Sequence, residues 1–152
     1  MPNAPRISFE FFPPQSLDAS FLLWETVQAL APMQPSFVSV TYGAGGTTRT
    51  LTHDAVSTIH RNYGLKVAAH LTCGNATRTE TLANAESYAA AGVTEIVALR
   101  GDAPKGAQRF VPHPLGFANS VELVEKLART GKFKIRVGAY PEPHPDAADA
   151  TA

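Results

Sequence analysis

The sequence is poor in cysteine, in net charge and in long apolar runs. Its one cysteine, Cys73, cannot form a disulfide within the chain, which fits a reducing compartment. Thirteen basic residues balance thirteen acidic ones, a pattern that does not favour nucleic-acid or acidic-membrane binding. No apolar run reaches the ~18 residues of a transmembrane helix, and residues 1–6 lack the apolar stretch of a signal peptide. We therefore expect a cytoplasmic protein with a small-molecule substrate and no nucleic-acid or membrane partner.

Apolar residues are plentiful and follow two periods along the chain. Five short runs typical of strands lie at residues 7–12, 37–42, 67–72, 95–100 and 135–140. Between them, apolar residues recur at the three- and four-residue steps of helices. Examples are Phe21, Leu22, Trp24, Val27 and Leu30, then Leu51, Val56, Ile59 and Tyr63, then Leu82, Ala85, Tyr88 and Ala89, then Val121, Val124 and Leu127. Proline or glycine follows each helical segment, at Pro32 and Pro35, Gly64, Gly92 and Gly131.

This alternation predicts an α/β protein with a parallel sheet, either doubly wound or closed into a (β/α)₈ TIM barrel. The polar residues favour the barrel. Alternate residues of a strand point to opposite faces of the sheet, and here one set becomes polar toward the strand ends while the other set is apolar. The polar set holds Ser8 and Glu10, Ser39 and Thr41, His70 and Thr72, and Arg100 and Asp102. The apolar set, which helices would cover, holds Ile7, Phe9, Phe11, Val38, Val40, Val97 and Leu99.

A complete barrel of this kind needs about 250 residues. Residues 1–152 supply only five strands and four helices. We therefore expect them to be the incomplete N-terminal part of a single catalytic domain, with open sheet edges.

Glu10 is the most informative single residue. It lies in an aromatic strand that ends at Pro13 and Pro14. A carboxyl group among phenylalanines is costly to ionise, which suits it to donating a proton near neutral pH. The alternative is a structural carboxylate that pairs with a basic neighbour such as Arg100.

Other strand ends carry further candidates, each with a structural alternative. Residues 43–46 (GAGG) permit close approach to a ligand, or form an ordinary flexible loop. His70 is a ligand contact or a satisfied core histidine, and no histidine pair has metal-ligand spacing. Arg100, Gly101 and Asp102 suit an anionic ligand group at a strand mouth, or form a structural ion pair. Tyr140 to His144, with alternating prolines, hold a ligand or form a rigid connector.

Taken in order, the strand-end segments resemble the methylenetetrahydrofolate reductase family along nearly the whole chain. The segments are residues 8–14 (SFEFFPP), 37–44 (FVSVTYGA), 70–73 (HLTC), 98–102 (ALRGD) and 139–145 (AYPEPHP). Five motifs in the same order are far more specific than any one of them.

The resemblance implies a (β/α)₈ barrel with non-covalent FAD at the strand ends. NADH or NADPH reduces the flavin, which then reduces methylenetetrahydrofolate to methyltetrahydrofolate in one-carbon metabolism. By position, Glu10 matches the family's general acid, which helps to open the folate's five-membered ring, and Asp102 matches a carboxylate that tunes the flavin and contacts the folate. The positions that match FAD contacts are Thr41, His70, Arg100, Gly101, Asp102, Ala118, Tyr140 and His144. Many members have tyrosine where this chain has Phe117, so a hydroxyl contact is expected to be lost. The resemblance further implies a homo-oligomer, and the scattered histidines predict no metal site.

Two alternatives to this oxidoreductase remain. The first is a non-catalytic module that needs the missing strands or a partner chain. A different flavin barrel, such as a relative of proline dehydrogenase, is disfavoured by residues 8–14 together with residues 98–102.

Overall fold

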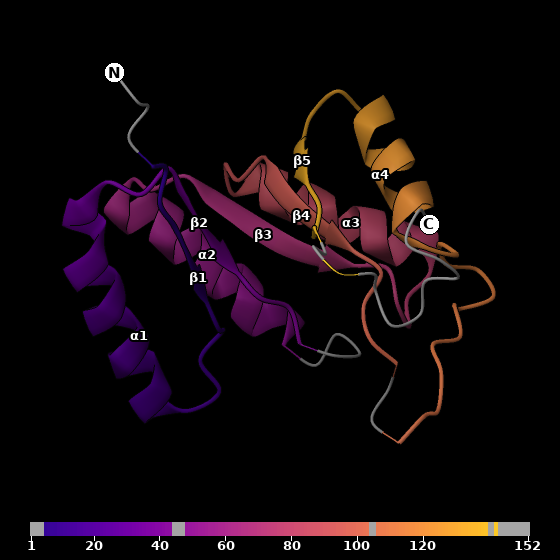
Figure 1. Ribbon diagram of the computed structural model, residues 1–152, viewed down its shortest axis with the longest axis horizontal. Coiled ribbons are helices and arrows are strands. Elements are labelled where there is room, and N and C mark those ends of the chain that lie inside the picture. Colours follow the sequence, from indigo (N-terminus) through magenta and orange to yellow (C-terminus); the bar gives the residue numbers. More distant parts are fainter. Residues whose placement is uncertain (1–4, 44–47, 104–105, 140–141, 143–152) are drawn as a thin grey trace.

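The computed structural model describes residues 5–43, 48–103, 106–139 and 142. Five strands form one parallel sheet in the order β1-β2-β3-β4-β5 (Figure 1). The strands are β1 (Ser8–Phe11), β2 (Phe37–Val40), β3 (Val67–Thr72), β4 (Glu95–Leu99) and β5 (Lys134–Arg136). Each strand lies beside the next one in the chain, whereas a doubly wound sheet reverses direction at a switch point. The chain is therefore an α/β protein with the strand order of a partial (β/α)₈ barrel.

Four α-helices connect the strands, as the sequence predicts. They are α1 (Leu17–Leu30), which continues into the short 3₁₀ helix η1 (Ala31–Met33), α2 (Arg49–Tyr63), α3 (Arg78–Ala90) and α4 (Ser120–Arg129). Figure 1 shows α2 and α3 behind the sheet, with α1 and α4 at its two flanks. Within the described ranges, each helix is too short or too polar to cross a bilayer.

Local side chains account for where the helices begin and end. The hydroxyl oxygens of Ser16 and Thr77 and the side-chain oxygen of Asn119 accept backbone N–H bonds at the starts of α1, α3 and α4. Thr77 and Glu80 form a reciprocal capping box. Helix α2 ends at Gly64, whose φ of 63° lies in the left-handed region that glycine adopts without a Cβ penalty.

The main core lies between the sheet and the helices. Alternate strand residues on the helix-covered face are buried, and they pack against the inner faces of the helices. These strand residues include Val38, Val40, Val67, Ala69, Leu71, Ile96 and Ala98, and the helical ones include Val27, Val56, Ile59, Tyr88, Leu123 and Leu127.

Strand β4 corrects one sequence prediction. Val97 and Leu99 were expected on the helix-covered face, but they pair with His70 and Thr72 and share their face of the sheet. The buried, helix-covered residues of β4 are instead Ile96 and Ala98. The prediction failed because it carried strand alternation on through Arg100 and Asp102, whereas β4 ends at Leu99 and the chain turns at Gly101 (φ 90°).

Helix α1 corrects a second prediction. Phe21 and Leu22 belong to its apolar pattern, yet both are exposed. Leu23 and Val27, four residues apart, face the core instead. Trp24 leans toward α2, where its ring stacks on Tyr63 at 6.4 Å.

Candidate functional site

A polar cluster of Glu10, Ser39 and His70 lies on the face of the sheet opposite the helices. Glu10 and Ser39 are register partners on β1 and β2, and His70 is on β3. Ser39 Oγ donates a hydrogen bond to Glu10 Oε2 at 3.0 Å. The same oxygen lies 3.1 Å from His70 Nε2. Strand pairing thus brings together three side chains that are far apart in the sequence.

His70 is buried and electrically neutral at physiological pH. Its exposed fraction is 8%, and burial lowers the pKa of its imidazole, although the Glu10 carboxylate acts in the opposite direction. Its Nε2 has no partner in good hydrogen-bond geometry among the described residues, despite the short separation from Glu10. His70 Nε2 is therefore a buried polar atom whose hydrogen-bonding capacity is not fully used within the described residues.

The expected enclosure of Glu10 by phenylalanines is wrong for this chain. The Glu10 side chain is 53% exposed, and its described hydrogen-bond and ion-pair partners are Ser39 and His70. Phe11 packs in the core, because it neighbours Glu10 on β1 and points to the opposite face, and Phe12, just after β1, is exposed. Any proton-donating role of Glu10 thus depends on polar neighbours and on what covers this face.

A cavity of about 320 Å³ adjoins the cluster. Its lining includes Glu10, Ser39 and His70 and, on the other side, Val97, Leu99 and Arg136. Arg136 donates two hydrogen bonds to Glu95 Oε2 and lies over the Phe37 ring at 3.6 Å. Apolar walls with a few convergent polar groups are typical of small-molecule sites.

The predicted Arg100, Gly101 and Asp102 form a turn at the end of β4. A Cβ on Gly101 would lie 3.1 Å from the Cβ of Thr72, so the turn passes close to the end of β3. Arg100 Nε donates to the Gly101 carbonyl, and the Arg100 guanidinium lies 4.5 Å from the centre of the Phe110 ring. Asp102 is exposed.

Thr41 lies at the end of β2, where α2 holds the chain. Its carbonyl accepts a hydrogen bond from the Thr52 hydroxyl at 3.0 Å, and the Gly43 N–H donates to Thr48 Oγ1 at 2.6 Å. The predicted glycine-rich loop continues into residues 44–47, which lie outside the described residues, as do Tyr140 and His144.

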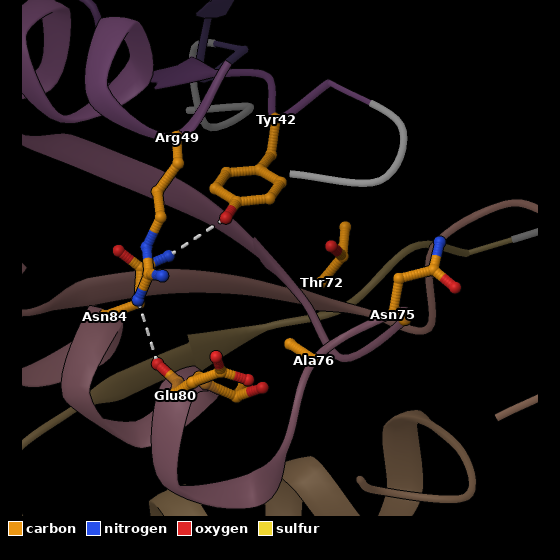
Figure 2. Close-up of a pocket in the computed structure, with 9 residues that line it drawn as sticks. Tyr42, Arg49, Thr72, Asn75, Ala76, Glu80 and Asn84 are labelled. Atoms are coloured by element: carbon orange, nitrogen blue, oxygen red, sulfur yellow. Dashed lines mark hydrogen bonds between the residues drawn. The ribbon is translucent and has the colours of Figure 1, made fainter. Parts of the chain in front are cut away.

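A second, smaller hollow of about 140 Å³ lies between the starts of α2 and α3 (Figure 2). Asn84 Nδ2 donates to the Tyr42 hydroxyl at 3.3 Å, and Arg49 donates to the Glu80 carbonyl at 3.0 Å. Burial raises the pKa of Tyr42, while Arg49 and Asn84 act to lower it, so its hydroxyl stays protonated. Of the predicted inner-face residues, only Thr72 lines this hollow.

Ala118 is exposed just before α4, and its N–H donates to Glu122 Oε2 at 3.2 Å. The neighbouring Phe117 is fully buried in the core, consistent with a residue that lacks a hydroxyl. Sequence reasoning missed the contacts of Phe110 and Arg136, because neither lies in a strand-end motif. The alternation of charged and apolar residues in 134–137 was the available signal for Arg136.

Comparison with known proteins gives a consistent result. The family model described as methylenetetrahydrofolate reductase matches residues 2–152. Two 5,10-methylenetetrahydrofolate reductases, from Pectobacterium carotovorum and Escherichia coli K12, are 43% and 42% identical over 147 residues. They align with 97% of this chain but with only 47% and 48% of their own lengths. The Arabidopsis thaliana methylenetetrahydrofolate reductase (NADH) 1 is 37% identical over 145 residues, which are 94% of this chain and 24% of the plant protein.

The chain spans about half the length of its bacterial relatives. The match nonetheless runs from the residues before β1 through the end of β5 and covers every strand end described above. The chain belongs to the methylenetetrahydrofolate reductase family.

Proposed function

We propose that this chain supplies the first part of an FAD-dependent barrel that reduces methylenetetrahydrofolate to methyltetrahydrofolate with NADH or NADPH. The observation that carries the proposal is the Glu10–Ser39–His70 cluster beside a partly apolar cavity, in a chain of this family. When bound, FAD would accept a hydride from the nicotinamide and pass it to the folate. The residues of the chain would bind and orient the cofactor and the substrate, and would transfer protons.

The described residues fit a flavin. The buried His70 Nε2 lacks a well-oriented partner, which a cofactor heteroatom can supply. Gly101, at a φ of 90°, lets the turn after β4 pass close to the Thr72 side chain, where a Cβ would lie 3.1 Å from the Thr72 Cβ. Arg100 would provide a guanidinium for an anionic group of the cofactor. Thr41, Gly101, Asp102 and Ala118 would complete the described contacts, and Tyr140 and His144 would add others.

Glu10 would act as the proton donor to the folate. Ser39 fixes one carboxyl oxygen by donating to it, and His70, held neutral by burial, leaves Glu10 outside a full ion pair. The other carboxyl oxygen is available to a substrate on the open face. Asp102, exposed in the turn after β4, would contact both folate and flavin.

The first experiment is an FAD titration followed by absorbance and fluorescence. The purified 152-residue chain would be compared with the same chain fused to the C-terminal half of the Escherichia coli relative. We expect micromolar or tighter binding by the fused protein and much weaker binding by the short chain. Failure of both proteins to bind would contradict the flavin function. Equal binding would show that five strands suffice for the cofactor.

Glu10→Gln in the fused protein tests the proton-donating role. We expect FAD binding and flavin reduction by NAD(P)H to persist, while folate reduction falls about 10²–10⁴-fold, the usual contribution of a general acid. Glu25→Gln, on the exposed face of α1, is the matched control and should keep full activity. Folate turnover by Glu10→Gln within a few-fold of wild type would remove Glu10 from this role.

The second candidate function is a non-catalytic module that associates with another chain. It is favoured by the half-length match to the relatives and by the open face around Glu10. The same FAD titration separates the two candidate functions, because a non-catalytic module would not need FAD as the short chain or as the fused protein.

A further inference from the structure

Arg78, the first residue of α3, contacts four consecutive residues before α4, either directly or through Glu122. Its backbone N–H donates to the Leu115 carbonyl at 2.9 Å, and its Nε donates to the Gly116 carbonyl at 3.0 Å. Its guanidinium carbon lies 4.8 Å from the centre of the buried Phe117 ring. No motif in the sequence singles out this arginine.

Glu122 extends the network to Ala118. One carboxylate oxygen, Oε2, accepts both from the Arg78 guanidinium and from the Ala118 N–H. A planar guanidinium suits this arrangement, because it can bind a carbonyl and a carboxylate from separate nitrogens at fixed angles. The orientation of the Ala118 peptide is thus coupled to Arg78 through a single oxygen atom.

The Arg78–Glu122 network contributes more to the positioning of residues 115–118 than to the free energy of unfolding. The side chains of Arg78 and Glu122 are 54% and 38% exposed, and ion pairs of that exposure add little to folding free energy. The packing around it is nevertheless close, since a Cβ on Gly116 would lie 2.6 Å from the Ala76 carbonyl oxygen. Loss of Arg78 should therefore loosen residues 115–118 while the rest of the chain stays folded.

The same loop has a second arginine contact, and it involves an expected ligand residue. Arg100 covers the Phe110 ring, which a Cβ on Gly74 would approach to 3.0 Å. An anionic group that binds Arg100 would compete with this stacking. Arg78 and Glu122 are not themselves expected ligand residues, so their ion pair can hold the segment in both the free and the bound state.

We propose that Arg78, acting through Glu122, is a positioning residue that fixes the Ala118 backbone for the cofactor. This inference rests on the proposed FAD function, in which Ala118 is a cofactor contact. The ligand at Ala118 would be a flavin dinucleotide, and Arg78 would act by pre-organising a backbone group on a loop.

The test compares Arg78→Gln, Arg78→Lys and Glu122→Ala in the fused protein and in the 152-residue chain. We expect FAD to bind about tenfold more weakly to each variant, the effect of roughly one lost charge-assisted hydrogen bond. Lysine should not rescue, because a point charge lacks the guanidinium's separate donors. The double variant Arg78→Gln/Glu122→Ala should bind no more weakly than either single variant, since both act through one link.

Amide hydrogen exchange of the 152-residue chain provides a readout without FAD. The Ala118 N–H should exchange at least several-fold faster in the Arg78 variants, with an unchanged melting temperature. Arg61→Gln on α2 and Glu125→Ala on α4 are matched controls on exposed helix positions and should behave as wild type. Unchanged FAD affinity and unchanged Ala118 exchange would overturn the inference. Absence of FAD binding by the wild-type fused protein would instead contradict the proposed function, and faster Ala118 exchange would still identify the link.

Discussion

Single residues in this chain acquire their chemistry from strand pairing. Glu10 is a plain carboxylate in the sequence, but in the sheet it faces the hydroxyl of Ser39 and the imidazole of His70. Neither neighbour lies within 25 residues of it along the chain. The His70 side chain is buried, whereas that of Glu10 is 53% exposed, and burial lowers the pKa of the histidine.

The pH response of His70 gives a stability prediction. Burial lowers the pKa of His70 below the 6.5 of an unfolded histidine, despite the opposing effect of Glu10. As pH falls below about 6.5, the unfolded chain binds a proton that the folded chain does not, so stability falls by at most about 1.4 kcal/mol per pH unit from this group. Urea unfolding at pH 7.5 and 5.5 should show a smaller acid loss for His70→Gln than for wild type. An equal acid loss in wild type and His70→Gln would contradict this assignment.

Tyr88 gives a second prediction for a single residue, in which a substitution stabilises the chain. Its ring is fully buried and stacks on His53 at 5.6 Å, but its hydroxyl has no hydrogen-bond partner among the described residues. Burial raises the pKa of Tyr88, so the hydroxyl stays protonated and costs desolvation energy. Tyr88→Phe should stabilise the chain by about 1 kcal/mol in urea unfolding. A clear destabilisation would mean that the hydroxyl is satisfied, for instance by an ordered water.

At the scale of elements, short strands depend on side chains that join them to their neighbours. Strand β5 has only three residues and pairs with β4 alone among the described strands. Glu95 on β4 accepts two hydrogen bonds from Arg136 and one from Lys134, both on β5. These bonds link the shortest strand of the described sheet to its neighbour.

Glu95→Gln should therefore loosen β5. Burial raises the pKa of Glu95, but the hydrogen bonds and charges of Arg136 and Lys134 outweigh it, and the net pKa lies below the usual 4.5. The Glu95 and Arg136 side chains are 15% and 27% exposed, so we expect a loss of about 1–2 kcal/mol at pH 7. This stability is present above pH ~4.5 and is lost as pH falls through the folded-state pKa, so wild type and variant should converge in acid. Glu86→Gln, from an exposed pair with Lys132, is the control and should change stability by less than about 0.5 kcal/mol.

At the scale of the whole molecule, the chain is an arc of sheet with helices on one face. Strand β3 is paired on both sides and buried along most of its length, whereas β1 and β5 are the edge strands of the described sheet. The inner face carries the candidate site and a cavity, and it is the face that a closed barrel would enclose.

Amide exchange should follow this arrangement. In the 152-residue chain, the β3 amides should exchange at the rate of global unfolding, and those of β1 and β5 at least about tenfold faster by local opening. The exchange rates can be measured by mass spectrometry or NMR at low protein concentration. Protection of β1 equal to that of β3 would indicate that another molecule covers the edge, and dilution would then reduce that protection.

Much of the fold could be predicted from the sequence, because apolar periodicity and helix-ending residues are local signals. The four helices, the first four strands and the position of Gly64 after α2 follow from them, whereas the fifth strand, expected at residues 135–140, is the shorter Lys134–Arg136. The faces of Val97 and Leu99 did not follow, since they depend on where β4 stops, and the exposure of Phe21 did not follow, since it depends on which face of α1 packs on the core.

The sequence by itself determined the family and the strand-end residues, since five ordered motifs are a one-dimensional property. Only the tertiary structure decided which of those residues meet. It brings Glu10 to Ser39 and His70, turns Arg100 onto Phe110 and links Arg78 to Ala118 through Glu122. The physical reason is that hydrogen bonds and ring contacts act over a few ångströms, and parallel register brings together residues that are tens of positions apart in the chain.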